Sequence, residues 1–353
     1  MNTKILATVG PASIDLVKNL QEKWAKRFRL NLSHWDVDFH KNAIQKIKKA
    51  WEDFWWNEIV LDTKWPDIRT WDIFSDDGKN LIKVKKWEEF ELIFSDKKEK
   101  IFWDEKKIFH GYKKFFSSVE IWDKIIIDDW KIVLIVEKKI NDWEKIFAIS
   151  KNSWEISSRR HINLPWKHID LPILTESDKK IISMWISEWI NAIAVSFVRN
   201  KEDILEVRKF ISENNLKNNS ENVKIISKIE NVEWLQNIDE IIKFSDEIMI
   251  ARWDLWVEVN FYKLPIIQKS IIQKCNRTLT PVIVATQMLM SMTENTTPTR
   301  AEVFDVSMAV SMWANTVMLS DETASWKNPV KAVNVMRKIC EFAEKSEDFI
   351  FNS

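Results

Sequence analysis

Apolar and polar positions along the chain predict eight short buried strands separated by amphipathic helices. Stretches such as 203–213 and 300–312 place their apolar residues on one helical face, and short apolar runs lie between such stretches. The predicted strands are Ile5–Val9, Phe28–Leu32, Ile59–Leu61, Ala192–Ser196, Lys224–Ile229, Ile248–Ala251, Pro281–Ala285 and Thr316–Leu319. Eight βα units of this kind indicate an α/β fold, a TIM (β/α)8 barrel, in which chemistry occurs at the carboxyl ends of the strands.

The pattern changes between residues 70 and 165, where short alternating runs are separated by turn residues. The strands predicted there are Leu81–Lys85, Phe90–Phe94, Lys124–Ile127, Ile132–Val136 and Lys145–Ile149. They indicate a small β-barrel-like domain inserted after the third barrel strand. We therefore expect residues 1–69 and 166–353 to form the barrel and residues 70–165 to form the inserted domain.

Charge and cysteine content narrow the class of protein. The chain has 53 Lys+Arg and 53 Asp+Glu, so it lacks the excess of positive charge that a nucleic-acid-binding protein needs. Its two cysteines, Cys275 and Cys340, cannot form a disulfide framework. No apolar run approaches the roughly 20 residues of a membrane span, and the start does not look like an export signal. We expect a cytoplasmic protein without nucleic-acid or membrane partners.

Glycine is rare and tryptophan is abundant. About 7% glycine is usual, which corresponds to about 25 residues here, whereas the chain has 3 Gly and 21 Trp. Several tryptophans occupy turn-like positions that favour glycine, including Trp65 before Pro66 and Trp130 after two aspartates. We hypothesise that most of these tryptophans are glycines in the organism's own protein, through a reassigned UGA codon. The alternative is a tryptophan-rich surface or carbohydrate-binding protein.

Polar side chains concentrate at the ends of the predicted strands. Arg29, Asn31 and Ser33 share one side of the second strand by the period of two. The arginine can bind phosphate, and the two oxygen-bearing side chains can face a cation. Asp62 and Thr63 add further oxygens after the third strand. An edge strand with a polar face, followed by an ordinary turn, remains an alternative for these residues.

Lys228 and Glu230 lie two positions apart, which predicts that both face the mouth of the barrel. Asp254 follows the next strand, and together the two carboxylates suit magnesium or manganese. A structural salt bridge is the alternative for the Lys228–Glu230 pair. A glycine at position 253 would leave backbone amides free to receive a substrate carboxylate. Thr286 adds a hydroxyl after the seventh strand.

Eight ordered segments resemble the pyruvate kinase family and span nearly the whole chain. They are Thr3–Ser13, Arg29–His34, Leu61–Lys64, Ile226–Asn231, Ile250–Leu255, Ala285–Leu289, Pro298–Glu302 and Met318–Ala324. The resemblance implies a barrel with a mobile lid inserted after strand 3. It also implies transfer of a phosphoryl group from phosphoenolpyruvate to ADP, giving pyruvate and ATP in glycolysis.

The resemblance also implies roles for single residues. The residues implied to be catalytic are Lys228, Arg29, Thr286 and Arg69. Those implied to bind substrate are Arg29, Lys228, Trp253, Asp254 and Thr286. Nucleotide binding is implied for Asn31, His34, Arg69 and Arg160. Mg²⁺ or Mn²⁺ would be held by Glu230 and Asp254, and K⁺ by Asn31, Ser33, Asp62 and Thr63. Asp67 is acidic where potassium-dependent members carry Glu, which favours dependence on potassium.

The chain departs from the family pattern at three points. Arg160 replaces a lysine, and Asp321 stands where the family has glycine. The chain ends at Ser353, so we expect the family's C-terminal regulatory domain to be absent. Sugar-phosphate activation is then not expected, and an oligomer, if one forms, is expected to assemble through the barrel. Two other functions remain open: a catalytically impaired homologue that binds phosphoenolpyruvate, and a different phosphoenolpyruvate or pyruvate lyase on the same barrel.

Overall fold

The computed structural model forms two compact units, each described here by itself. It describes residues 1–51, 57–64, 68–74, 80–95, 106–140, 145–167, 169–186, 190–214, 223–259 and 261–351. The barrel unit comprises Met1–Trp65, Ile173–Trp256 and Phe261–Ser353. The sheet unit comprises Pro66–Pro172 and Val257–Asn260. Trp65 and Asp67, used in the sequence predictions, lie outside the described residues.

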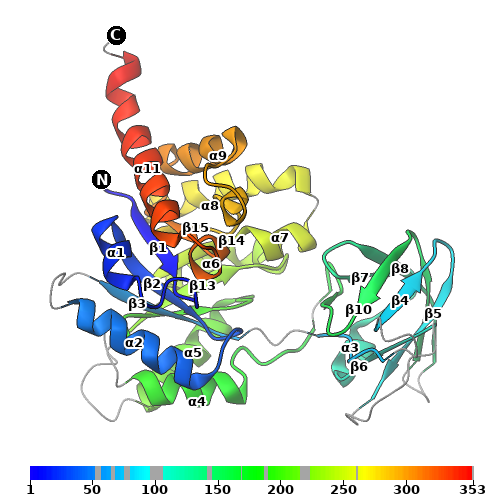
Figure 1. Ribbon diagram of the computed structural model, residues 1–353. Helices are drawn as coiled ribbons and strands as arrows, with labels where there is room; N and C mark the ends of the chain where they lie inside the picture. The colour runs from blue at the N-terminus through cyan, green and yellow to red at the C-terminus, as the bar shows by residue number, and fades with distance from the viewer. Residues whose placement is uncertain are drawn as a thin grey trace. The chain divides into compact units, whose positions relative to one another are not determined.

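The barrel unit is a closed barrel of eight parallel strands surrounded by helices (Figure 1). The strands are β1 (Lys4–Thr8), β2 (Ala25–Asn31), β3 (Glu58–Asp62), β12 (Ala192–Val195), β13 (Lys224–Ile229), β14 (Glu247–Ala251), β15 (Val282–Ala285) and β16 (Thr316–Leu319). Their order around the barrel is β1-β16-β15-β14-β13-β12-β3-β2, and it closes where β2 pairs with β1. The predicted TIM barrel is confirmed, and each predicted barrel strand overlaps an observed one.

Helices follow the strands and cover the barrel. They are α1 (Val17–Glu22), α2 (Val37–Trp51), α4 (Glu176–Trp185), α5 (Lys201–Glu213), α6 (Trp234–Phe244), α7 (Arg252–Glu258), α8 (Leu264–Thr278), α9 (Arg300–Ser311), α10 (Asp321–Ala324) and α11 (Pro329–Phe351). Reciprocal hydrogen bonds between Thr299 and Glu302 fix the start of α9, because they satisfy backbone amides that have no partner in the helix. Helix α4 begins in the same way, through Thr175 and Asp178.

The interior of the barrel is filled by alternate residues of its strands. Leu6, Val60, Ala192, Ala194, Ile226, Met249, Ile283, Ala285 and Met318 form one buried cluster. A second, ionic cluster lies at the amino ends of the strands, where Arg27 Nε is 2.7 Å from Glu58 and Arg27 Nη1 is 2.7 Å from Glu247. Arg27 is therefore a buried structural cation, because it lies at the amino ends of the strands and the chemistry of such barrels lies at their carboxyl ends.

The described residues of the sheet unit form two sheets. The larger has the order β11-β7-β8-β9-β5-β6, and the smaller pairs β10 with β4. The elements are β4 (Leu81–Val84), β5 (Glu89–Phe94), β6 (Lys107–His110), α3 (Lys113–Ser118), β7 (Lys124–Ile127), β8 (Ile132–Ile140), β9 (Lys145–Ser150), β10 (Trp154–Ser157) and β11 (Ile162–Asn163). Side chains such as Phe90, Ile125 and Leu134 form a hydrophobic core of its own. None of the helices in the described part of the chain combines the length and apolarity needed to cross a bilayer.

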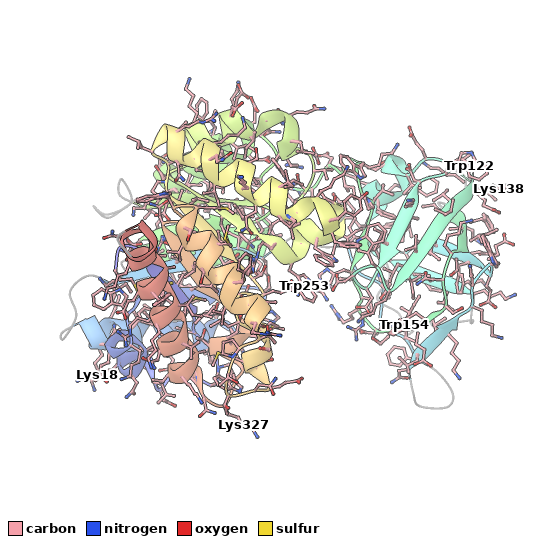
Figure 2. All side chains as sticks on the ribbon, turned by 90° about the horizontal axis from the view of Figure 1, so that it is seen from above. Lys18, Trp122, Lys138, Trp154, Trp253 and Lys327 are labelled. Carbon is pink, nitrogen blue, oxygen red and sulfur yellow. The ribbon has the colours of Figure 1, made fainter. Side chains whose placement is uncertain are left out.

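Seven of the described tryptophans have a left-handed backbone conformation. Their φ angles are 84° at Trp24, 63° at Trp35, 68° at Trp87, 76° at Trp122, 69° at Trp130, 67° at Trp166 and 70° at Trp313. A side chain with a Cβ adopts this conformation at a cost, whereas glycine adopts it freely. Many tryptophans are also exposed, and Figure 2 shows Trp122 and Trp154 of the sheet unit and Trp253 of the barrel unit among the labelled side chains.

Candidate active site

Five neighbouring strands of the barrel bring two of the predicted catalytic residues, Arg29 and Lys228, together with Asp62. The strands β2, β3, β12, β13 and β14 lie side by side and end at the same mouth, because all are parallel. Arg29 lies near the end of β2, Asp62 ends β3, and Lys228 lies near the end of β13. All three side chains are at least nine-tenths buried. The barrel thus holds two cations and a carboxylate in one small, largely dry space.

Lys228 is the centre of this arrangement. Its Nζ lies 2.9 Å from Asp62 Oδ1 and 2.8 Å from Glu230 Oε1, and it donates to Ser196 Oγ at 2.9 Å. An ammonium group has three N–H donors, so all three have an acceptor. Burial alone would lower the pKa of Lys228, but the Asp62 and Glu230 carboxylates outweigh it and raise that pKa above its usual value. Lys228 is therefore a permanent positive charge.

Asp62 connects Lys228 with Arg29. Arg29 Nε donates to Asp62 Oδ2 at 2.6 Å, and Arg29 Nη1 donates to Thr8 Oγ1 at 3.1 Å. Burial would raise the pKa of Asp62, but the two cations overcome this effect and lower it below its usual value. Asp62 is thus ionised and holds the arginine and the lysine close together. Two adjacent cations can neutralise a transferring phosphoryl group.

Glu230 and Asp254 are the candidates for a divalent ion. Glu230, which is 1% exposed, accepts the backbone N–H of Phe197 at 2.8 Å and contacts Lys228 through its other oxygen. Asp254 lies in the first turn of α7, which follows β14, the neighbour of β13. Lys228 and Glu230 therefore form the salt bridge that was the alternative interpretation of this pair. Lys228 nevertheless lies at the barrel mouth.

The chemistry of these two carboxylates fits a hard cation. Both supply oxygen donors only, and from neighbouring strand ends, which suits Mg²⁺ or Mn²⁺. No cluster of three or more His, Cys, Asp or Glu gathers into a metal site among the residues described. An ion held by this pair would complete its coordination with substrate oxygens and water, as Mg²⁺ commonly does.

Thr286 lies directly after β15 in a left-handed backbone turn. Its φ is 68°, and that of Gln287 is 53°. Arg252 holds this turn, because its Nε donates to the carbonyl oxygens of Ala285 and Thr286 at 3.2 and 3.1 Å. The Thr286 hydroxyl donates to the Ala285 carbonyl and accepts the backbone N–H of Trp253 at 3.0 Å. With tryptophan at position 253, this backbone N–H is thus bonded to Thr286; the expectation for a glycine at this position stays a prediction.

The four residues predicted to hold potassium lie at the ends of β2 and β3, where Asn31 pairs in register with Asp62. Ser33 does not share the strand face with Asn31, because β2 ends at Asn31 and the chain turns there. Its backbone N–H instead donates to Asn31 Oδ1 at 3.2 Å. Thr63 Oγ1 accepts the backbone N–H of Ser196 at 3.1 Å. The predicted nucleotide-binding His34 is exposed just beyond this turn.

Arg69 and Arg160 belong to the sheet unit and lie on adjoining segments. Thr70 N donates to Arg160 O at 2.8 Å, and Arg160 N donates to the Thr70 hydroxyl at 2.9 Å. Arg69 Nη1 donates to Arg159 O at 2.9 Å, and its Nη2 lies 2.7 Å from His161 Nε2. Within this unit the segments that carry the two predicted nucleotide-binding arginines are thus paired, while the Arg160 side chain contacts Asp128.

Three residues that contact the predicted site were not found from the sequence. Ser196 and Phe197 contact Lys228 and Glu230, and Arg252 supports Thr286. A serine after a strand resembles an ordinary turn residue, and a backbone amide has no signal in the sequence at all. Arg252 could have been found as a charged residue in the first position after a buried strand. Asp321, which stands where the family has glycine, is exposed at the start of α10 without a left-handed φ in its backbone.

Comparison with known proteins agrees with this geometry. The family described as "Pyruvate kinase, barrel domain" matches residues 1–333. A pyruvate kinase of Clostridium acetobutylicum is 37% identical over 352 residues, covering 98% of this chain and 71% of the relative. A pyruvate kinase of Candida albicans is 36% identical over 349 residues, covering 98% of this chain and 67% of the relative.

A solved structure gives the same result. The crystal structure of a pyruvate kinase from Cryptosporidium parvum superposes with a TM-score of 0.90 at 36% identity. The match covers 98% of this chain and 69% of that one. A barrel with this strand order, these residues at its mouth and relatives of this similarity place the chain in one family: it belongs to the pyruvate kinases.

Proposed function

We propose that the chain transfers the phosphoryl group of phosphoenolpyruvate to ADP, giving pyruvate and ATP. The observation that carries the proposal is the buried pair of cations, Arg29 and Lys228, which share Asp62 at the barrel mouth. A phosphoryl group in transfer carries its charge on peripheral oxygens, and catalysis depends mostly on positioning and charge neutralisation. Two cations held by one carboxylate supply both.

The reaction assigns a role to each side chain. An oxygen of the ADP β-phosphate attacks phosphorus, and the bond from phosphorus to the enol oxygen breaks. Arg29 and Lys228 stabilise the phosphoryl group, and Lys228 also stabilises the enolate oxygen that remains. A proton then reaches the terminal carbon of the enolate to give pyruvate. Thr286 lies on that proton path, and because a hydroxyl is a weak acid a water molecule relays the proton.

Cations complete the site in this proposal. Glu230 and Asp254 hold Mg²⁺ or Mn²⁺, while Asn31, Ser33, Asp62 and Thr63 hold K⁺. The divalent ion supplies further neutralisation of phosphoryl charge when it is bound. Glu230 is oriented for this role by the Phe197 amide, and Asp62 by Arg29 and Lys228.

The sheet unit is the lid in this proposal. Residues 70–165 form the lid domain, and residues 1–69 and 166–353 form the barrel domain. In this unit, Arg69 and Arg160 have the role of binding nucleotide phosphates. In the barrel unit, nucleotide binding is assigned to Asn31 and His34. Glycolytic substrates place the reaction in the cytoplasm, and any assembly of copies uses the barrel.

A coupled assay of pyruvate formation from phosphoenolpyruvate and ADP tests the proposal, with and without Mg²⁺ and K⁺. It is made on the printed chain and on a glycine form, which carries Gly at all 21 Trp positions. We expect Lys228→Met to lower kcat/KM by at least about a hundredfold, because a buried charge that stabilises the transition state is lost. The matched control is Lys269→Met on the exposed face of α8, which leaves turnover unchanged. Absence of turnover in both forms of the chain overturns the proposal.

A further inference from the structure

The turn after β12 contacts both members of the Lys228–Glu230 pair. Strand β12 ends at Val195, and the next two residues, Ser196 and Phe197, form the turn. Ser196 is 2% exposed. Strand β12 lies between β3 and β13 in the barrel. Of this turn, only the Phe197 amide has a role in the proposed function, and Ser196 has none.

Ser196 is fixed on both sides by Thr63. Its backbone N–H donates to Thr63 Oγ1 at 3.1 Å, and its hydroxyl donates to Thr63 O at 3.1 Å. A serine hydroxyl has one hydrogen to donate, so its remaining capacity is as an acceptor. That capacity faces Lys228 Nζ at 2.9 Å. Thr63, directly after β3, therefore fixes the position of the Ser196 hydroxyl, and this hydroxyl fixes one N–H of the Lys228 ammonium.

Phe197 holds Glu230 through its backbone. Its φ of 57° is left-handed, a conformation that a non-glycine residue adopts only with strain. In this conformation the Phe197 N–H reaches Glu230 Oε2 at 2.8 Å, and Asn231 Nδ2 donates to the Phe197 carbonyl at 3.4 Å. The strained turn is thus tied at both ends to the segment that carries Lys228 and Glu230.

We propose that Ser196 is a positioning residue that fixes the direction of the Lys228 ammonium, while the adjoining Phe197 amide fixes Glu230. The proposal rests on the proposed function, since it concerns the same phosphoryl-transfer site. Of the three acceptors of Lys228, two are carboxylates, which compete with a phosphoryl group for its positive charge. Ser196 is the neutral one. It orients the ammonium without cancelling the charge that catalysis uses.

Removal of the hydroxyl tests this role. In Ser196→Ala we expect kcat to fall about tenfold to a hundredfold, because a hydrogen bond to a charged group is lost. KM for ADP changes by less than about twofold, since the nucleotide is bound elsewhere. Ser196→Thr keeps the acceptor and recovers most of kcat. The matched control is Ser227→Ala, at an equally buried serine that bonds Ser245 and not Lys228, and it leaves kcat unchanged.

A second measurement does not depend on turnover. An ammonium held by three acceptors exchanges its protons slowly with water, so Lys228 gives a ¹H–¹⁵N ammonium signal that Lys228→Met identifies. We expect Ser196→Ala to remove or broaden this signal and Ser227→Ala to leave it. An unchanged kcat, or an unchanged signal, in folded Ser196→Ala overturns the inference. If the parent chain has no turnover, the proposed function fails, and the signal alone still decides whether Ser196 positions Lys228.

Discussion

At the residue scale, the backbone at the tryptophans bears on how the chain is translated. Trp35, Trp130, Trp166 and Trp313 are among the positions where the family resemblance implies glycine, and each has a left-handed φ. Trp24, Trp87 and Trp122 have the same conformation. An aromatic side chain gains nothing from it, whereas glycine adopts it without strain. The geometry supports the hypothesis that these positions are glycine in the organism's own protein.

Other tryptophans carry no such signal. Trp234 begins α6 and is buried, while Trp253 and Trp256 lie in α7. A helical backbone does not require glycine, and glycine inside a helix is less favourable than most residues. The hypothesis for these three positions rests on the family resemblance alone.

Replacement by glycine should affect stability differently at tryptophans with a left-handed φ and at tryptophans without one. We expect Trp166→Gly and Trp313→Gly each to raise the free energy of unfolding by about 1 kcal/mol, because relief of the left-handed strain exceeds the entropy that glycine adds to the unfolded chain. Both side chains are exposed, so little packing is lost. Urea unfolding measures the change.

The matched control is Trp154→Gly in β10, where the tryptophan is also exposed but its φ is not left-handed. There we expect a loss of about 1 kcal/mol, since glycine weakens a strand. Destabilisation by glycine at positions 166 and 313 as well would contradict the argument. The intact mass of the protein from its own cells decides the codon question directly.

At this scale, some residues of the candidate site could be predicted from the sequence and others could not. Lys228 and Glu230 could be predicted, because charges on a buried strand need a reason. Ser196 could not be distinguished from a turn residue, and the Phe197 amide acts through a φ of 57° that the residue type disfavours. Charged residues on a buried strand can be recognised in a sequence, whereas a residue that orients them through its backbone cannot.

At the element scale, the barrel strands were predictable because each is a short run buried on both faces. The sheet unit was harder. Strand β8 continues to Ile140, past the predicted end at Val136. Its pairing with β9 shifts in register between Val136 and Lys138, and the lysines there interrupt the apolar alternation that predicts a strand. Strands β6, β10 and β11 were missed. Each has only two to four residues and gives one hydrophobic side chain to the core of the unit, Ile108, Ile156 or Ile162, which is too little to show the alternation of a strand.

Strand β6 ends in a buried histidine, His110, whose protonation we expect to destabilise its unit. His110 is fully buried, its ring lies 5.1 Å from that of Phe115, and burial lowers its pKa to about 4. An unfolded histidine has a pKa near 6.5. The unfolded state therefore binds a proton more readily than the folded one. The stability that this difference contributes is complete above about pH 6.5 and is lost as the pH falls towards 4.

We expect the free energy of unfolding of the sheet unit to fall by about 2 kcal/mol between pH 7 and pH 5 through His110. His110→Gln cannot take up this proton, so its free energy of unfolding does not fall in this way. The difference in free energy of unfolding between the parent chain and the variant therefore shrinks by that amount between pH 7 and pH 5. Urea unfolding at the two pH values measures it. His34→Gln, at an exposed histidine of the barrel unit, is the control and keeps the parent's pH dependence. An equal pH dependence in His110→Gln would show that His110 is not the acid-sensitive group.

At the scale of the whole molecule, the chain divides into two units with separate cores. The interior of the barrel is filled by residues such as Leu6, Val60 and Met249, and that of the sheet unit by Phe90, Ile125 and Leu134. Each core is thus built within one unit. Arg29 and Lys228, proposed to be catalytic, belong to the first unit, while Arg69 and Arg160 belong to the second. The proposed reaction requires both units.

This separation predicts that Pro66–Pro172 folds when it is produced alone. A core shared by two sheets and one helix is sufficient for a domain of this size. We expect a cooperative urea transition, β-type circular dichroism and the acid sensitivity of His110 at the magnitude found in the whole chain. The His110→Gln fragment is the control, because it should fold and lose only the acid sensitivity. A fragment without a cooperative transition would mean that Val257–Asn260, which groups with this unit, is needed to complete it; addition of a peptide of that segment would then restore the transition.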